Sequence, residues 1–212
     1  MTALVGLITA AGESKRMGQP KVGLCFPNGT SFVSHISRAF SEAGCQDIYL
    51  SLPPNAIHQA FHQHLDPFQV QTFSNSLPHL EQSGSILDLL KRVRPEPEGV
   101  LVWPIDTPFA ETKHLLQLIT AFEERPESGL VVLGAPKRGG HPFLLGRSFF
   151  PKLENNARNG GLRSVVREHA DQVTSCNATQ ENLFANLNCP DDYQEAFGAE
   201  PRFLPNSLYF MQ

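Results

Sequence analysis

The chain has no marked excess of charge, no long apolar run and no clustered cysteines. Its 17 lysines and arginines are outnumbered by 21 aspartates and glutamates, for a formal net charge of −4. The broad basic surface of nucleic-acid-binding proteins is therefore not predicted. No apolar stretch approaches the length of a membrane span, and the N-terminus lacks the apolar core of a secretory signal peptide. We expect no nucleic-acid partner, no membrane partner and a cytoplasmic location.

The four cysteines are far apart, and no two of them form a C-x-x-C pair. This spacing favours reduced thiols and argues against a zinc site. Among His58, His62 and His64, two imidazoles have the helical i, i+4 spacing that zinc can use, but their polar neighbours indicate a solvated helix face rather than a metal site.

The length of 212 residues, with 41% hydrophobic and 18% charged residues, predicts one globular domain. We expect this domain to span residues 1–200. Residues 201–212 then form a tail, broken by prolines but carrying aromatic and aliphatic side chains. The tail is either a frayed end or a segment that docks on a partner chain.

Apolar runs typical of strands alternate with helical patterns along most of the chain. The predicted strands are Leu4–Ile8, Asp47–Leu52, Phe68–Phe73, Gly99–Trp103, Gly129–Leu133, His141–Leu145 and Leu183–Leu187. The predicted helices are 32–43, about 55–65, a helix starting at Ser83, Thr112–Glu124, Gly161–His169 and Pro190–Phe197. This order predicts an α/β fold, a Rossmann-like three-layer sandwich with a mostly parallel central sheet. Ligands of such sheets bind beyond the carboxyl ends of the strands.

The most informative segment is the loop after the first predicted strand, residues 9–21. It combines small residues with two glycines and three cations. Small residues let backbone N–H groups approach an anion closely, and Arg16 and Lys21 supply charge for phosphate oxygens. The glycine spacing matches neither the P-loop nor the dinucleotide-binding fingerprint. The loop therefore predicts a triphosphate site of another kind.

The segment from Ala11 to Lys21 resembles the signature A-G-x-S-x-R-M-G-x-x-K of nucleotidyltransferases that act on cofactor and sugar phosphates. It is most similar to the MobA-like nucleotidyltransferases, and among them to the molybdenum cofactor cytidylyltransferases. The resemblance implies a fold of the nucleotide-diphospho-sugar transferase type. It also implies that the nucleotide is bound by Ala10, Ala11, Gly12, Glu13, Ser14, Arg16 and Lys21, with Arg16 and Lys21 taking part in catalysis.

A carboxylate, Asp106, directly follows the predicted strand Gly99–Trp103 and is flanked by two prolines. Mg²⁺ prefers one or two carboxylates together with substrate phosphates and water. Asp106 is thus a candidate metal ligand, and it matches the P-x-D-x-P element that holds the metal in the resembled family. Alternatively, it caps the following helix or forms an Asx-turn.

A second metal-binding position is implied by the segment from Asn186 to Tyr193, which resembles the family element D-I-D-T-P-E-D-[YF]. Asn186 occupies the position that helps to bind metal, and Asn188 replaces the second aspartate. An amide oxygen still ligates Mg²⁺ but brings no negative charge. The first-turn acids Asp191 and Asp192 are expected simply to favour the helix dipole.

Two further segments resemble the acceptor-binding elements of the family. His141 lies in a G-H-P element and is expected to contact the acceptor phosphate, although a partly buried turn histidine is an alternative. Arg163 follows Asn159-Gly160-Gly161, where the family carries G-D-x-G-x-R and this chain lacks the acidic residue. The resemblance implies that Ser85 contacts the base of the nucleotide. Alternatively, this segment only begins a helix, with Ser83 as its N-cap.

Together these features predict a Mg²⁺-dependent nucleotidyltransferase that moves CMP from CTP to a phosphorylated acceptor and releases pyrophosphate. The resemblance implies molybdopterin as the acceptor, with docking to a molybdoenzyme or its chaperone. CTP is favoured because the methyl group of Ala11 replaces a glycine found in relatives that transfer GMP. The alternatives are a nucleotide-binding maturation module with weakened catalysis, and a transferase for a sugar or polyol phosphate.

Overall fold

Two neighbouring strands, β1 (Leu4–Thr9) and β5 (Gly99–Pro104), form the centre of the structure and are buried on both faces. Alternate side chains enter two separate hydrophobic clusters: Leu4 and Ile8 point into one, and Val5 and Leu7 into the other. This explains why the two strands read as continuous apolar runs. The computed structural model describes residues 3–53, 68–125, 127–134, 140–178 and 180–205.

The described residues form a seven-stranded sheet in the order β4-β3-β1-β5-β7-β6-β8. Its other strands are β3 (Asp47–Leu52), β4 (Gln71–Ser74), β6 (Leu130–Leu133), β7 (Gly140–Gly146) and β8 (Val173–Cys176). Only β7 runs antiparallel to its neighbours, and the other pairs are parallel. The predicted mostly parallel sheet is confirmed. Because β7 is reversed, its first residues lie at the edge where β1 and β5 end.

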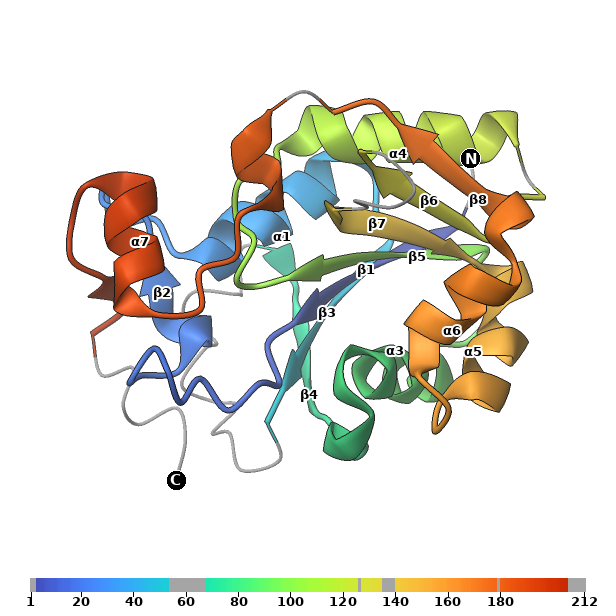
Figure 1. The fold of residues 1–212 in the computed structure, drawn as a ribbon, viewed down its shortest axis with the longest axis horizontal. Helices are drawn as coiled ribbons and strands as arrows, with labels where there is room; N and C mark the ends of the chain where they lie inside the picture. Colours follow the sequence, from blue (N-terminus) through green and yellow to red (C-terminus); the bar gives the residue numbers. More distant parts are fainter. Residues whose placement is uncertain (1–2, 54–67, 126, 135–139, 179, 206–212) are drawn as a thin grey trace.

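Helices cover both faces of the sheet and complete the three layers (Figure 1). One face carries α1 (Phe32–Glu42) and α4 (Thr112–Glu124), and the other carries α3 (Glu81–Arg92), α5 (Phe150–Asn156) and α6 (Gly161–Glu168). The Ser31 hydroxyl caps α1 by accepting a hydrogen bond from the Ser34 amide at 3.1 Å. None of the described helices is long and apolar enough to cross a membrane.

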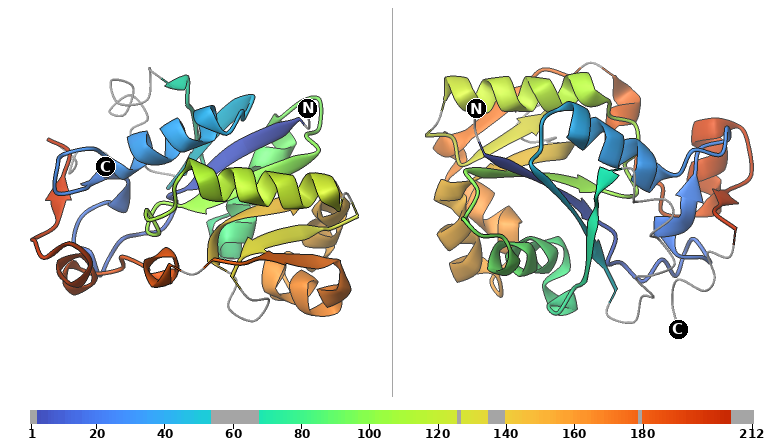
Figure 2. Two further views of the ribbon diagram at one scale, coloured as in Figure 1. Left: turned by 90° about the horizontal axis from the view of Figure 1, so that it is seen from above. Right: turned by 180° about the vertical axis from the view of Figure 1, so that it is seen from behind.

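The C-terminal part of the chain returns to the segment that follows the loop of residues 9–21 (Figure 2). There β2 (Leu24–Cys25) pairs with β9 (Arg202–Phe203) beside α7 (Pro190–Phe197). The buried Tyr193 hydroxyl donates to the Cys25 carbonyl at 2.8 Å, and the Leu204 amide donates to the Gly23 carbonyl at 2.8 Å. Residues 202–204 are thus joined to the domain.

Several predicted elements differ from the structure. The strand predicted over Leu183–Leu187 is wrong, because a 3₁₀ turn (Glu181–Phe184) takes its place and the Leu187 amide bonds to the loop carbonyl of Asp106 at 2.8 Å. Helix α3 begins at Glu81 rather than at Ser83. The predicted helix 55–65, with His58, His62 and His64, lies outside the described residues.

Candidate nucleotide-binding site

A cavity of about 620 Å³ opens at the edge where β1 and β5 end. Its lining includes most of the predicted site residues: Ala10, Ala11, Gly12, Glu13, Ser14, Arg16, Lys21, Ser85, Asp106, His141 and Asn186. Arg163 is not among the lining residues; it is exposed on α6. The structure thus brings the predicted nucleotide and metal positions together with His141 and leaves Arg163 outside the cavity.

Ser14 fixes the shape of the loop at one end of the cavity. Its backbone has a positive φ of 53°, which non-glycine residues rarely adopt. The Ser14 hydroxyl accepts a hydrogen bond from the Lys21 amide at 3.0 Å, and the Ser14 carbonyl accepts one from the Met17 amide at 3.0 Å. Met17 is buried, whereas Gly12 and Arg16 are exposed toward solvent. The loop is therefore anchored while its anion-binding groups stay accessible.

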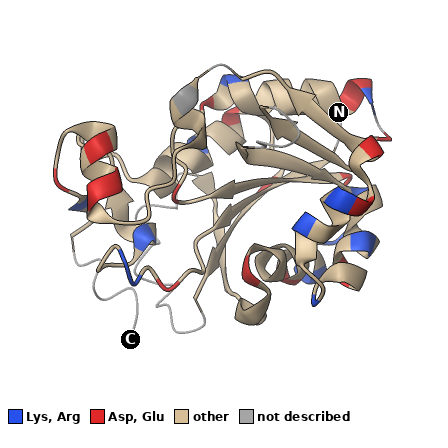
Figure 3. Ribbon diagram, in the orientation of Figure 1, with Lys and Arg blue, Asp and Glu red and all other residues tan. Residues whose placement is uncertain are grey.

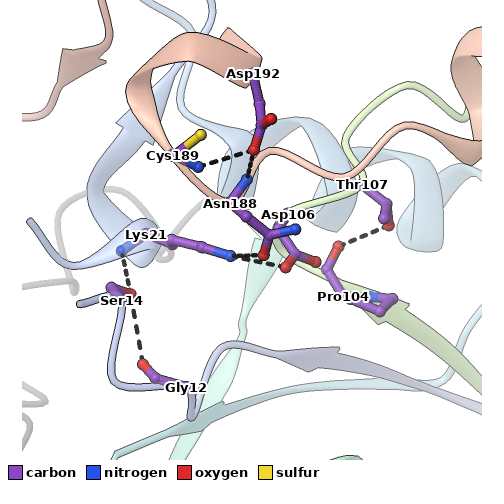
Figure 4. A network of polar contacts seen from close by, with 9 residues as sticks. All are labelled: Gly12, Ser14, Lys21, Pro104, Asp106, Thr107, Asn188, Cys189 and Asp192. Carbon is purple, nitrogen blue, oxygen red and sulfur yellow. Dashed lines mark hydrogen bonds and ion pairs between the residues drawn. The ribbon is translucent and has the colours of Figure 1, made fainter. Parts of the chain in front are cut away.

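The Lys21 ammonium lies between Asp106 and Asn188 (Figure 4). Its Nζ is 2.8 Å from Asp106 Oδ2 and 2.8 Å from Asn188 Oδ1. Only 14% of the Lys21 side chain and 24% of the Asp106 side chain are exposed. The two oxygens form a cation-binding position. Asn188, which the sequence analysis did not assign to the site, contributes one of them, and Asn186 lines the cavity nearby.

Asp192 holds Asn188 in place (Figure 4). Its carboxylate accepts hydrogen bonds from the backbone N–H of Asn188 at 2.7 Å and from the backbone N–H of Cys189 at 2.9 Å. These bonds lower the pKa of Asp192, and the bond from the Asn188 backbone N–H contributes most. Asp192 therefore does more than favour the dipole of α7: it orders the turn that presents Asn188 to Lys21.

The turn that carries Asp106 is fixed by buried hydrogen bonds. The Trp103 indole donates to the Thr107 carbonyl at 2.8 Å, and the Thr107 hydroxyl donates to the Pro104 carbonyl at 3.1 Å. The cap of α4 is Glu111, in a reciprocal pair of hydrogen bonds with His114. Asp106 therefore does not cap that helix and is available to a cation.

The donor set fits a hard divalent cation. Asp106 supplies a carboxylate, Asn188 and Asn186 supply amide oxygens, and the Lys21 ammonium already occupies a position between Asp106 and Asn188. Within the described residues there is no group of three or more His, Cys, Asp and Glu side chains that could hold a metal alone. A cation here needs further ligands from substrate phosphates and water.

A buried polar cluster forms the floor of the cavity at α3. The Ser51 hydroxyl donates to Ser85 Oγ at 2.9 Å, and the Asn75 amide donates to the same atom at 3.3 Å. Ser85 is 1% exposed. Asn75 Oδ1 in turn accepts from the Leu77 amide at 2.9 Å. Ser85 is thus held rigidly, and its own hydroxyl hydrogen is left for another acceptor.

The first turn of α3 forms the wall opposite the loop. Glu81 and Gln82 line the cavity, and Gln82 Nε2 lies 3.3 Å from His141 Nε2. Burial lowers the pKa of His141 to about 4, against the opposing effect of Asp106. His141 is therefore neutral near pH 7 and acts there as a hydrogen-bonding group.

Ser83 is not the N-cap of its own helix but contacts another. Its hydroxyl accepts a hydrogen bond from the Leu162 amide, in the first turn of α6, at 3.2 Å. Gly161 has a φ of +55°, and a Cβ there would lie 2.4 Å from Ser83 Oγ. This contact docks α6 on the helix that lines the cavity.

Figure 3 shows the basic residues of α5 and α6 grouped apart from those of the loop.

The chain is similar in sequence to known proteins. A sequence profile described as the MobA-like NTP transferase domain matches residues 6–173. The probable molybdenum cofactor guanylyltransferase of Rhodopirellula baltica is 32% identical over 203 residues, or 92% of each chain. The profile match ends before Asn188, so it does not cover that contact to Lys21.

Solved structures share the fold. Rv0371c from Mycobacterium tuberculosis H37Rv matches with a TM-score of 0.74 and 22% identity, covering 93% of this chain and 99% of that one. A second structure of Rv0371c, complexed with manganese, matches with a TM-score of 0.66 at 22% identity and the same coverage. At this identity the likeness concerns the fold alone.

Proposed function

The chain belongs to the MobA-like NTP transferase family, and from that premise we propose that it transfers a nucleoside monophosphate to a phosphorylated pterin, the precursor of a molybdenum cofactor dinucleotide. The observation that carries the proposal is the convergence of Lys21, Asp106 and Asn188 beside the loop of residues 9–21. That convergence supports a cation-binding position next to a loop that we propose binds triphosphate.

In the proposed reaction an oxygen of the acceptor phosphate attacks the α-phosphorus of the nucleotide. A new P–O bond forms there, the bond from the α-phosphorus to the bridging oxygen breaks, and pyrophosphate leaves. The amides of the loop and Arg16 bind the β- and γ-phosphates. Lys21 moves from Asp106 to the α-phosphate and stabilises the charge that develops. Because the acceptor is already an anion, no strong general base is needed, and positioning and electrostatics supply the catalysis.

A divalent cation fits this site, with Asp106, Asn188 and Asn186 as its protein ligands. When bound, it supplies charge neutralisation between the phosphates of the nucleotide. Mg²⁺ is the metal that the sequence predicts, and the manganese complex of Rv0371c is a precedent for a divalent metal on this fold.

Two nucleotides are candidates for the donor. The relative from Rhodopirellula baltica is named a guanylyltransferase, which favours GTP. The methyl group of Ala11, which lines the cavity, favours the smaller base of CTP. Calorimetric measurement of the affinities for GTP, CTP, ATP and UTP, with and without Mg²⁺, distinguishes the two donors.

The decisive test of turnover is pyrophosphate release with a phosphorylated pterin acceptor, compared between the wild type and Asp106→Ala. Release that needs Mg²⁺ and is lost in the variant supports the proposal. Release with a sugar or polyol phosphate instead keeps the transferase and replaces the acceptor. Tight binding of a triphosphate without metal and without turnover identifies a nucleotide-binding maturation module, for which the replacement of acids by Asn186 and Asn188 would account.

A further inference from the structure

Glu81, the first residue of α3, has an unusual backbone. Its φ is 51° and its ψ is −133°, a combination that glycine adopts readily and other residues avoid. The described residues include three non-glycine positions with positive φ, and two of them, Ser14 and Glu81, line the cavity. Strained backbone of this kind gathers at functional sites.

Backbone contacts on both sides of Glu81 fix its conformation. The 3₁₀ turn Pro78–Leu80 precedes it, and its amide donates to the Pro78 carbonyl. Three residues later, Gly84 packs so closely on Leu77 that a Cβ would lie 2.1 Å from the Leu77 carbonyl oxygen. Glycine at position 81 would fit the same path without strain. The presence of a glutamate there therefore needs a reason other than folding.

The cations that line the cavity, Lys15, Arg16 and Lys21, all belong to the loop, where Glu13 is also present. Glu81 lies apart from them on the α3 wall, beside Gln82 and Ser85. A triphosphate binds at the cationic end and is repelled by the carboxylate. Glu81 is therefore left to face an uncharged, ring-shaped part of a substrate, and the N-terminus of α3 favours its negative charge.

A carboxylate offers two acceptor oxygens side by side, which match two parallel N–H donors. Resting on the proposed function, we propose that Glu81 reads the 2-amino-4-oxopyrimidine edge, in which a ring N–H and an amino group stand next to each other. Guanine and pterin share this edge. Cytosine and adenine place a single amino group next to an acceptor nitrogen, and uracil has one N–H between two carbonyls, so all three match the carboxylate less well.

The test uses binding, with probes that differ by one group. GTP is compared with ITP, which lacks the 2-amino group, and 6-hydroxymethylpterin is compared with 6-hydroxymethyllumazine, in which oxygen replaces that amino group. CTP is the unrelated triphosphate. The proteins are the wild type, Glu81→Gln, Glu81→Gly and the control Glu195→Gln, which alters an exposed acid of α7 away from the cavity. Glu81→Gly keeps the backbone path, so loss of folding does not confuse the result.

We expect the wild type to bind either GTP more tightly than ITP or 6-hydroxymethylpterin more tightly than 6-hydroxymethyllumazine. The difference in affinity should be about tenfold to a hundredfold, the range for a bidentate pair of hydrogen bonds. Both Glu81 variants should lose that preference, and Glu195→Gln should keep it. Loss confined to GTP assigns the contact to the base, and loss confined to the pterin assigns it to the acceptor. The inference is overturned when neither pair is affected, or when CTP weakens as much as GTP and the pterin. Failure of wild type to bind any triphosphate overturns the proposed function itself and is seen before any variant is made.

Discussion

Lys21 Nζ and Asp106 Oδ2 lie 2.8 Å apart although the two residues are separated by 85 positions in the chain. The pair joins the end of the loop of residues 9–21 to the turn that follows the central strand β5. Because the Asn188 amide oxygen lies at the same distance from the ammonium, Lys21 occupies a position suited to a metal ion. A metal and Lys21 should therefore compete for Asp106 until a triphosphate attracts the ammonium away.

Replacing Lys21 with methionine should make this competition visible. Lys21→Met removes the charge and shortens the unbranched side chain by one atom, so Mn²⁺ should bind the nucleotide-free protein more tightly than it binds wild type. Pyrophosphate release should fall by about two to three powers of ten, as for loss of one contact to developing charge. Electron paramagnetic resonance titration of free Mn²⁺ measures the first effect. Unchanged Mn²⁺ affinity would mean that the ammonium does not compete.

The neighbouring asparagines provide a matched pair. Asn188→Ala removes an oxygen 2.8 Å from the Lys21 ammonium, whereas Asn186 is more exposed. We expect Asn188→Ala to lower the affinity for the metal–nucleotide complex by roughly tenfold to a hundredfold, the range for groups that order a metal site. Asn186→Ala should have the smaller effect in the same calorimetric titration. The reverse order would assign the second ligand to Asn186, as the sequence suggested.

Loss of the contact between α3 and α6 should weaken folding. Ser83→Ala leaves the part-buried Leu162 amide without its acceptor and should cost about 1 kcal/mol in the free energy of unfolding. Gly161→Ala should cost more, because it adds a Cβ near the Ser83 hydroxyl at a positive φ. Urea denaturation measures both, with Ser148→Ala, an exposed serine, as the control. A Ser83→Ala protein as stable as this control would show that the contact contributes nothing.

His141 should make stability depend on pH. Its pKa is lowered to about 4 in the folded protein from an ordinary value of 6.5, so between these values the unfolded chain binds a proton that the folded protein does not. Stability is therefore complete above pH 6.5 and falls as the pH decreases toward 4. From pH 7 to pH 5 the wild type should lose about 2 kcal/mol more than His141→Gln. Parallel slopes for the two proteins would contradict the lowered pKa.

Glu81→Gly should stabilise the fold while it removes base or pterin selectivity. Relief of the strained φ outweighs the greater freedom of glycine in the unfolded chain, and a gain of about 1 kcal/mol is expected. Thermal denaturation checks this, with Glu81→Gln as the matched variant that keeps the strained backbone. A less stable Glu81→Gly protein would show that the glutamate is there for stability.

The strands and helices with regular periodicity could be predicted from the sequence, as β1, β5 and α4 show. The direction of β7 could not, because alternation of apolar residues is the same in parallel and antiparallel strands. The pair β2 and β9 has two residues per strand, too few for any pattern. The apolar run before Asn188 was taken for a strand, but its amide at Leu187 bonds to the Asp106 carbonyl rather than to a sheet.

The loop and Asp106 could be found because they follow strands that end at one edge. The sequence could not show which of Asn186 and Asn188 contacts Lys21, because both precede α7. The contact depends on the turn that Asp192 stabilises, which only the structure shows. The conformation of Glu81 could not be predicted either, because nothing in the sequence marks this glutamate as a residue with a positive φ.

The pairing of β2 with β9, and the contact of Asn188 with Lys21, make the site depend on residues that are synthesised after all seven strands of the large sheet. A growing chain that ends before Asn188 already contains every strand of the large sheet and the whole loop of residues 9–21. It lacks the amide oxygen that orders Lys21 and the strand that braces β2. On the ribosome, the sheet is therefore available for folding before the cation-binding position is complete.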